Sequence, residues 1–525
     1  MASKPPAGRS APSCAAASSC ATARSSRKAA ASLSASTKRS SLLPEPDLYP
    51  ERTLMTFKPA LLISAALLLS MPSAFAQERT AFEQKARSLY EEAVAVRTAK
   101  GQGKVPELVD YLVSELKAAG FTDADIEVTD YENDGELTQG LMVWYRAEGE
   151  AAEKPIVLLA HMDVVDALPD TWERYPFDLI EEDGYFFGRG TADNKYGVVS
   201  LVATFMRLKE EGFQSNRDLV IALSGDEETG MISTRAQAEY TAENIDPAYV
   251  LNADAGGLTL DMDGKALLYG VQGSEKTYAT FELTISNPGG HSSAPRADNA
   301  IYELADVLQK IEAHKFPVMH SPLTLASFKS GGAQTPGPLG AAMLAFAENP
   351  EDEAAIATLR ADPSTVGSTG TTCVATMLRA GHAENALPQR ATATVNCRIF
   401  PGVGIDATEK TLKEVGGNEN LKIKLISDLV ESPESKLPDD VMAAVNTALA
   451  ARGLEGLPVV PHMSSGGTDG MFYRNLGYDT LGIGGSGAKP NDTFAHGLNE
   501  RLSVDAFYGG LDHWYIILKE LAGGE

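Results

Sequence analysis

Basic residues are scarce in this chain. Its 525 residues include 45 Lys and Arg but 71 Asp and Glu, which gives a formal net charge of −26 at pH 7. Because so acidic a protein repels polyanions, the composition argues against nucleic acid and anionic membranes as partners. The length and a hydrophobic share of 43% predict a large soluble protein of two or three domains.

Long apolar runs are also lacking. Residues 1–54 are rich in Ser, Ala and Arg without apolar periodicity, which predicts disorder. Residues 55–76 have one basic residue, an apolar stretch from Ala60 to Leu69 and a final Ala-Phe-Ala, the pattern of a secretory signal peptide. We therefore expect translation to start at Met55 and the protein to be exported, periplasmic or secreted, without stable membrane association. A genuine long presequence or an uncleaved anchor is the alternative, although the stretch is short for a membrane span.

Cysteine is rare, with four residues in the chain. Cys14 and Cys20 fall in the leader, and no motif around the others indicates a catalytic thiol. Cys373 and Cys397 lie in two strand-like runs that could form a hairpin, where an oxidising compartment would allow a disulfide. Two small buried thiols are the alternative, which the sequence favours.

The sequence does contain polar clusters that directly follow apolar runs. The runs 155–160, 219–223 and 249–253 are short and continuously apolar, which predicts strands of a parallel sheet covered on both faces. The carboxyl ends of such strands meet at one edge, where open α/β sheets bind their ligands. The side chains that follow the three runs are His161, Asp163, Glu227, Glu228 and Asp254.

Two further segments add metal-binding side chains. Asp193 lies in a glycine-rich loop before an expected helix, and His496 lies near the C-terminus. With His161, Glu228 and Asp254 they provide two imidazoles and three carboxylates, a mixture that suits zinc, with manganese or cobalt as alternatives. Five ligands are too many for one tetrahedral zinc ion. If one carboxylate bridges, the set divides into two sites, and paired metal ions activate a water and bind substrate oxygens.

The order of these motifs resembles metallopeptidase family 20, which includes glutamate carboxypeptidase, aminoacylase, desuccinylases and carnosinase-type dipeptidases. The resemblance runs from about residue 85 to the C-terminus, and seven motifs in the family's order make it specific. They are His161-x-Asp163, Gly188-Arg189-Gly190-x-x-Asp193-x-Lys195, Asp226-Glu227-Glu228, Asn252-Ala253-Asp254, Gly289-Gly290-His291-Ser292-Ser293, Gly466-Gly467-Thr468-Asp469 and Ala495-His496-Gly497. The segment Trp172–Phe177 and the long middle insert are most similar to the Gly-Xaa carboxypeptidase branch, which also contains N-acyl-amino-acid hydrolases.

The resemblance implies two zinc ions per subunit. His161 and Asp254 would hold one ion, Glu228 and His496 the other, and Asp193 would bridge them.

It also implies roles for two carboxylates that do not bind metal. Glu227 would be the general base that takes a proton from the bridging water and returns it to the leaving amine. Asp163 would accept the second N–H of the metal-bound imidazole and fix its tautomer. Asn194 replaces an acidic residue of many relatives, and we expect little consequence.

The metal-ligand pattern is interrupted in the middle of the chain. It stops after Asp254 and resumes only at His496, while strand alternation begins near Thr277. Helices are expected at about 300–313, 341–348 and 353–360. The catalytic domain is therefore expected to be discontinuous.

The resemblance implies the same architecture. The expected fold is α/β, with a mixed, largely parallel sheet flanked by helices as the catalytic di-metal domain. That domain would comprise residues 77–273 and 431–525, and residues 274–430 would form a smaller inserted α+β lid. Related lids dimerise, so we expect a homodimer through the lid.

The lid carries candidate substrate-binding residues. His291, in a flexible loop, would stabilise the oxyanion, and in related dimers this residue reaches the neighbouring subunit's site. Asn385 and Arg398 match positions that hold the substrate's free carboxylate, which suits the planar guanidinium fork. Gly467 and Thr468 lie in a glycine-rich loop that the family uses near the substrate, although loop-end capping is an equal alternative.

The expected reaction is hydrolysis of an amide bond next to a free C-terminal carboxylate, as in a carboxypeptidase or dipeptidase. An N-acyl-amino-acid amidohydrolase is the alternative, so the substrate would be a peptide or an N-acyl amino acid. A non-catalytic scaffold or receptor with the same fold is an alternative of another class. Such a relative should have lost ligands or the base, and this sequence keeps them all.

Overall fold

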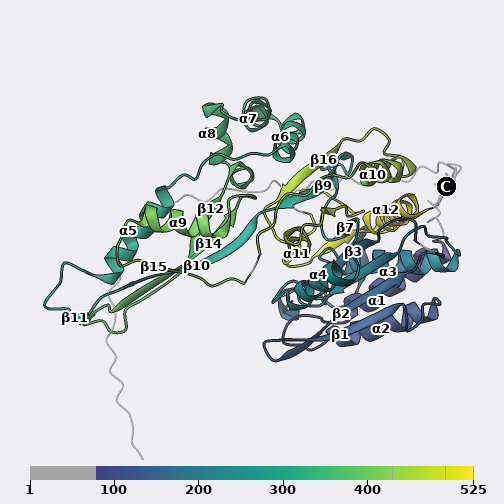
Figure 1. Cartoon of the computed structure of the whole chain (residues 1–525), viewed down its shortest axis with the longest axis horizontal. Helices are drawn as coiled ribbons and strands as arrows, with labels where there is room; N and C mark the ends of the chain where they lie inside the picture. Colours follow the sequence, from purple (N-terminus) through teal and green to yellow (C-terminus); the bar gives the residue numbers. More distant parts are fainter. Residues whose placement is uncertain (1–78, 150, 429, 491, 524–525) are drawn as a thin grey trace, which may run out of the picture. The chain divides into compact units, whose positions relative to one another are not determined.

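The computed structural model describes residues 79–149, 151–428, 430–490 and 492–523. The expected disorder of residues 1–54 and the signal peptide at 55–76 lie outside the described residues. In the described part of the chain, ten strands form one mixed sheet (Figure 1). Its order is β1 (Ile126–Asn133), β2 (Glu136–Tyr145), β6 (Leu219–Ser224), β3 (Ile156–His161), β7 (Tyr249–Asn252), β17 (Thr480–Gly482), β9 (Ala266–Glu275), β8 (Gly257–Leu260) and β18 (Gly487–Ala488), with β16 (Val459–Ser464) paired to β9.

Burial on both faces of the sheet explains why the sequences of the three central strands are continuously apolar. β6, β3 and β7 are parallel neighbours and are buried at every position. Along β3, Ile156, Leu158 and Ala160 pack into one hydrophobic core, whereas Val157 and Leu159 pack into another. Since alternate side chains point to opposite faces, both faces of the sheet are covered. The polar residues that follow these strands therefore emerge at one edge.

Helices supply both covering layers. One core includes residues of α1 (Ala81–Ala95), α2 (Val105–Ala118), α3 (Lys195–Glu210), α10 (Asp439–Ala451) and α12 (Val504–Ala522), and the other includes α4 (Ile232–Asn244) and α11 (Gly470–Asn475). A capping box between Thr80 and Glu83 begins α1, and the Ser503 hydroxyl caps α12. No helix in the described ranges has both the length and the apolar character of a membrane span.

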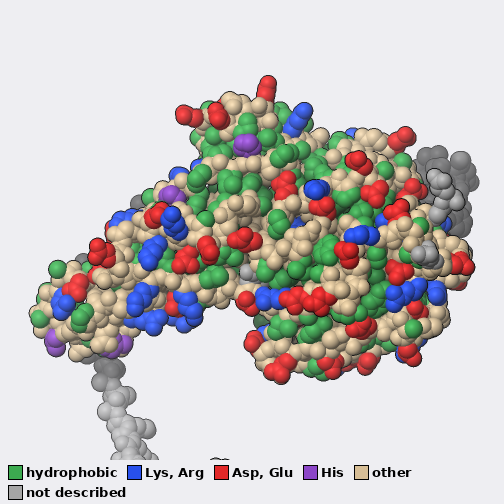
Figure 2. Space-filling view, viewed as in Figure 1, with side chains coloured by type: hydrophobic (Ala, Val, Ile, Leu, Met, Phe, Trp, Pro, Cys, Tyr) green, Lys and Arg blue, Asp and Glu red, His purple; other side chains and the backbone are tan. Residues whose placement is uncertain are grey.

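Smaller elements border this sheet. The short helix η1 (Pro169–Thr171) precedes a three-stranded sheet of β19 (Arg501–Ser503), β5 (Tyr185–Phe187) and β4 (Ile180–Glu182). On the face drawn in Figure 2, Asp and Glu side chains are spread widely, as expected from the acidic composition.

A second, antiparallel sheet forms the lid. Its order is β12 (Thr372–Ala380), β14 (Arg390–Ile399), β10 (Thr277–Ser286) and β15 (Lys422–Leu425). Phe281 and Val395 pack with residues of α5 (Ala300–Ala313) and α9 (Ile405–Gly416) on one face. One covered face gives the alternating burial along β14, as is usual for antiparallel sheets. The pair β11 (Gly290–His291) and β13 (Ala386–Leu387) extends from this region.

Between α5 and β12 the chain forms a helical insert. It contains α6 (Pro322–Gln334), α7 (Gly337–Glu348), α8 (Glu353–Ala361) and η2 (Val366–Thr369), with a core of its own around Phe328 and Phe346. The sequence predicted α7 and α8 but not α6, whose Gly331-Gly332 pair resembles a helix breaker. Those glycines face α7: a Cβ on Gly340 would lie 2.9 Å from the Gly332 carbonyl oxygen. Close packing of the two helices therefore explains the glycines.

The lid contains a disulfide. Cys373 and Cys397 are directly opposite across β12 and β14, and their sulfurs are bonded. The expectation of two buried thiols is wrong. The expectation failed because the register of the hairpin places these two cysteines opposite each other. That register cannot be deduced from two isolated strand-like runs.

Candidate active site

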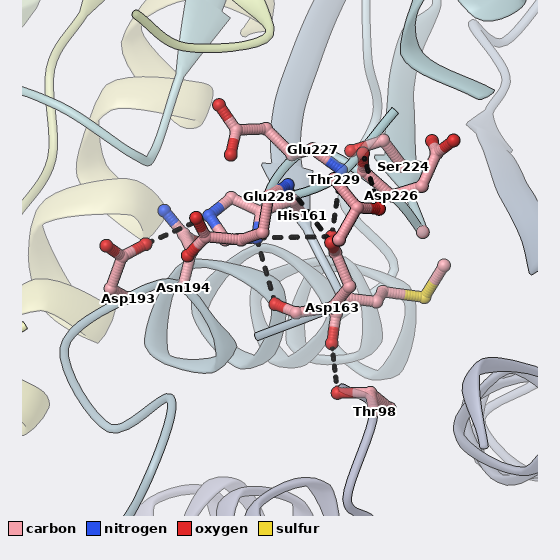
Figure 3. Close-up of polar contacts among 12 residues, drawn as sticks. Thr98, His161, Asp163, Asp193, Asn194, Ser224, Asp226, Glu227, Glu228 and Thr229 are labelled. Carbon is pink, nitrogen blue, oxygen red and sulfur yellow. Dashed lines mark hydrogen bonds and ion pairs between the residues drawn. The ribbon is translucent and has the colours of Figure 1, made fainter. Parts of the chain in front are cut away.

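The carboxyl ends of the central strands bring the predicted polar residues together. His161 is the last residue of β3, Glu227 and Glu228 follow β6, and Asp254 follows β7. Figure 3 shows His161 between Asp193 on one side and Asp163 on the other. The sheet edge expected from the sequence is therefore the place where these side chains meet.

The five predicted metal ligands form two overlapping groups. Their ligand atoms lie within 4.8 Å of one another in the set His161, Asp193 and Asp254 and again in the set Asp193, Glu228 and His496. Asp193 belongs to both sets: Oδ1 is 2.9 Å from His161 Nε2, and Oδ2 is 3.1 Å from His496 Nε2. A carboxylate whose two oxygens face different imidazoles is suited to bridge a pair of cations.

The donor chemistry fits divalent metal ions. Each imidazole directs Nε2 at carboxylate oxygens: His161 Nε2 is 3.6 Å from Asp254 Oδ1, and His496 Nε2 is 2.7 Å from Glu228 Oε1. Hydrogen bonds to Asp193 and Glu228 raise the pKa of His496 to about 10. Three carboxylates thus create a strongly negative site around two nitrogen donors, which a pair of cations would neutralise.

Asp163 mainly fixes the loop that carries the two glutamates. Its carboxylate accepts the backbone N–H groups of Glu227 and Glu228, each at 3.0 Å. His161 Nδ1 donates to the backbone carbonyl of Asp163 at 3.0 Å, whereas the Asp163 carboxylate is 3.5 Å away. The predicted tautomer control therefore comes chiefly from the main chain of Asp163.

Glu227 lines a cavity of about 350 Å³ together with Asp193, Glu228, Asp254 and His496. We call it the metal cavity. Burial, followed by the charges of Asp254, Asp469 and Glu228, raises the pKa of Glu227 well above its ordinary value despite the opposing effect of His161. A carboxyl group in this environment can both accept and return a proton.

A buried ion pair holds the Asp193 loop. Glu500 Oε1 accepts the backbone N–H groups of Ala192 at 2.8 Å and Asp193 at 3.0 Å, and its Oε2 pairs with Arg189 Nη1 at 2.5 Å. Both side chains of this pair are almost completely buried. Glu500, whose role the sequence did not indicate, therefore positions Asp193.

Asn194 has a structural role that its sequence pattern did not reveal. Its side-chain amide donates to Asp254 Oδ1 and so orients that predicted ligand. Asn194 is itself buried, and the peptide bond between Asp193 and Asn194 is cis.

Arg398 provides a cation in the metal cavity. Its guanidinium donates to the Ser465 carbonyl at 3.1 Å and lies 4.6 Å from the ring centre of Tyr278, which also lines the cavity. Among the described residues no carboxylate forms an ion pair with it, and burial lowers its pKa. Gly467 lines the same cavity, with Met231 and Met471, neither of which stands in a recognisable motif.

Thr468 is placed differently from its neighbour Gly467. It is 6% exposed and donates to Glu275 Oε2 at 3.1 Å, so it supports a buried network instead of lining the cavity. Glu275 pairs there with Arg474, a contact between residues far apart in sequence that no local pattern indicates. Asp469 accepts hydrogen bonds from Ser224 and Thr234.

His291 and Asn385 lie together but not in the metal cavity. Both are exposed beside the β11 and β13 pair, and the backbone N–H of Ser292 donates to the Asn385 carbonyl. His291 Nδ1 accepts from the Ser293 N–H at 3.1 Å. The described part of a single chain therefore assembles the predicted metal ligands and Arg398 without these two residues.

Sequence comparisons identify relatives with two kinds of activity. N-fatty-acyl-amino acid synthase/hydrolase PM20D1 from Xenopus tropicalis is 30% identical over 369 residues, which cover 67% of this chain and 69% of that protein. Probable carboxypeptidase S-like 2 from Dictyostelium discoideum is 27% identical over 383 residues, or 70% of this chain and 71% of that protein.

Structure comparison finds the same fold. The M20 family metallo-carboxypeptidase Sso-CP2 from Sulfolobus solfataricus superimposes with a TM-score of 0.62 and 19% identity, over 83% of this chain and 98% of that one. The model of peptidase family M20/M25/M40 matches residues 157–520, which include every predicted metal ligand. The chain is a metal-dependent hydrolase and belongs to peptidase family M20/M25/M40.

Proposed function

We propose that this hydrolase cleaves an amide bond next to a free C-terminal carboxylate, using two zinc ions. The observation that carries the proposal is the position of Arg398, which forms no ion pair among the described residues, in the same cavity as two overlapping groups of predicted metal ligands. His161 and Asp254 would hold one ion, Glu228 and His496 the other, and Asp193 would bridge them.

The residues of the metal cavity would have separate roles in this reaction. The guanidinium of Arg398 binds the substrate carboxylate and so fixes the position of the neighbouring amide. When bound, the zinc pair supplies an activated water and polarises the amide carbonyl. Glu227 takes the proton of the attacking water and passes it to the leaving nitrogen as the C–N bond breaks, so that a carboxylic acid and an amine are released.

Peptides and N-acyl amino acids both contain the free carboxylate and the neighbouring amide bond that the metal cavity is proposed to recognise. The Dictyostelium relative's name supports the carboxypeptidase or dipeptidase assignment, whereas the Xenopus relative's name supports N-acyl-amino-acid hydrolysis as the second candidate. The two candidates differ in what lies on the acyl side of the amide, which Arg398 does not contact.

Purified protein from residue 77 onward, assayed with Gly-Leu and with N-acetyl-leucine, separates the candidates. We expect cleavage of Gly-Leu that a chelator abolishes and zinc restores. Cleavage of the acyl substrate alone would favour the amidohydrolase. No metal-dependent turnover of either substrate would contradict the proposal and favour the non-catalytic scaffold.

We further propose that two chains pair through β12. This strand is an edge of the lid sheet, and Val374, Met377 and Leu378 on it are 59%, 51% and 63% exposed. Unpaired edge strands with exposed apolar side chains are templates for pairing with another chain. A partner would then offer His291 and Asn385 to the metal cavity. Light scattering should give a dimer, and Leu378→Glu should give a monomer.

We also propose that the protein is exported from the cytoplasm, on observations that do not involve the active site. The Cys373–Cys397 disulfide is typical of proteins from oxidising compartments, and the leader-like residues 55–76 would direct the chain there. Cell fractionation with N-terminal sequencing should find a protein that starts near Gln77 outside the cytoplasm. A cytoplasmic protein that retains these residues would contradict the proposal.

A further inference from the structure

A second cavity, of about 450 Å³, lies where the helical insert joins the lid. Its walls come from the end of α5, the end of α8, η2, the first residues of β12 and Ser465. We call it the insert cavity. None of the proposed metal ligands lines it, so it is distinct from the metal cavity.

Basic side chains predominate in the insert cavity. His314, Lys315 and Arg360 line it, with Glu312 as the single acidic residue. Arg360 Nη2 donates to the Phe316 carbonyl at 2.7 Å, and no ion pair forms between Arg360 and any carboxylate in the described ranges. The buried Nε2 atom of His314 has no hydrogen-bond partner among those residues. In so acidic a protein, Lys315 and Arg360, which form no ion pair in the described ranges, are a local concentration of positive charge.

A buried lysine lies behind the cavity wall and adds to this charge in its protonated form. Lys276 is 1% exposed, and its ammonium donates to the carbonyls of Gly367 at 2.9 Å and Gly370 at 2.8 Å, both of which are wall residues. Burial and the charge of Arg398 lower its pKa to about 7. Buried charges without counterions cost free energy, which a bound anion offsets.

The remaining wall combines apolar side chains with the hydroxyl groups of Ser and Thr residues. Phe316, Val366 and Val374 line it, beside the Cys373 end of the disulfide. Its volume is in the range of small-molecule sites, which combine apolar walls with a few polar groups that fix orientation. A ligand that fits this composition carries an anionic head and an apolar body.

We propose that the insert cavity binds an organic carboxylate with an apolar tail, its head at Arg360 and Lys315. The choice of an organic carboxylate as the ligand rests on the proposed function, because the substrates and acidic products of such a hydrolase are organic carboxylates. Ser465 lines the insert cavity, and its carbonyl accepts the Arg398 hydrogen bond. Occupancy of the insert cavity therefore changes the KM of substrates whose carboxylate binds Arg398.

Calorimetric titration with decanoate tests the proposal directly. The zinc-loaded Glu227→Gln protein should bind decanoate at two sites, of which Arg398→Met removes one. Arg360→Met should weaken the other about tenfold or more, since it removes a charge partner from a partly desolvated site. Decanol, which has the same tail without the charge, should not bind there.

A matched pair of exposed residues controls for folding. Lys315→Glu reverses a charge in the insert cavity, whereas Lys329→Glu reverses one at an exposed position of α6 outside it. Decanoate binding should weaken in the first variant only. Equal binding in both variants and in Arg360→Met would overturn the proposal. Because the titration does not depend on turnover, a failure of the proposed hydrolysis would appear separately, as an inactive wild-type enzyme that still binds decanoate.

Discussion

The two sets of residues expected to act on the substrate are built in opposite ways. Three of the five predicted metal ligands, His161, Glu228 and Asp254, lie at or just after the ends of buried strands. Hydrogen bonds from neighbouring residues hold two of the five: Glu500 accepts the backbone N–H of Asp193, and Asn194 donates to Asp254. His291 and Asn385 lie exposed on the lid, where their contacts are to each other's loop and to the β11 and β13 pair. The comparison shows that one chain brings the five predicted metal ligands together by itself, whereas it leaves His291 and Asn385 outside the metal cavity, which the proposed dimer would explain.

Removal of the carboxylate that is proposed to bridge the two metal ions should have the largest effect. Because both ligand groups share Asp193, Asp193→Ala is expected to lose both metal ions and all metal-dependent turnover. Asp166→Ala, which removes an exposed partner of Arg97, should change neither, because such surface pairs contribute little. Metal content by mass spectrometry and turnover provide the check. A variant that keeps both ions would show that Asp193 does not bridge.

The lid residues should act across a dimer. His291→Ala is expected to lower kcat about a hundredfold if it removes an oxyanion donor, whereas His382→Ala, exposed in the same region, should not. Mixing His291→Ala with Glu227→Gln should restore activity, because a hybrid dimer has one intact site. Mixtures as inactive as their parents would mean that His291 does not act across the dimer, and a His291→Ala variant with full kcat would place His291 outside the reaction.

Arg398 should affect binding more than chemistry. Arg398→Met is expected to raise KM about ten- to a hundredfold for substrates with a free carboxylate, since a charged hydrogen bond is lost. Substrates with a C-terminal amide should be unaffected. Arg390→Met, on the same strand but paired with Glu282, is the matched control. An equal loss for both substrate types would mean that Arg398 does not recognise the carboxylate.

Replacement of Lys276 should have the smallest of these effects, a change in stability that depends strongly on pH. Its folded pKa of about 7 is below the ordinary value of 10.5, so between these values the unfolded state binds more protons, and stability rises with pH. The stability of the wild type relative to Lys276→Met should therefore increase from pH 7 toward 10.5. Thermal unfolding at several pH values measures this difference. A constant difference would mean that Lys276 stays charged in the folded protein.

The sequence predicted the parts of the site that depend on local pattern. Continuous apolar runs located β3, β6 and β7, and the residues after them proved to share one edge of the sheet. The Arg189–Glu500 pair was not predicted, because its partners are 311 residues apart and neither stands in an apolar pattern. Gly467 and Thr468 are adjacent in sequence, yet only the structure shows that Gly467 lines the metal cavity whereas Thr468 donates a hydrogen bond to Glu275.

The most direct test of the account is to count metal ions and measure turnover in the wild type and in Glu227→Gln. The side chain of Glu227 is expected to transfer protons and not to hold metal. The account therefore predicts two zinc ions per chain in both proteins and a kcat lower by about two to four orders of magnitude in the variant. A variant that loses zinc, or one that retains full activity, would contradict it.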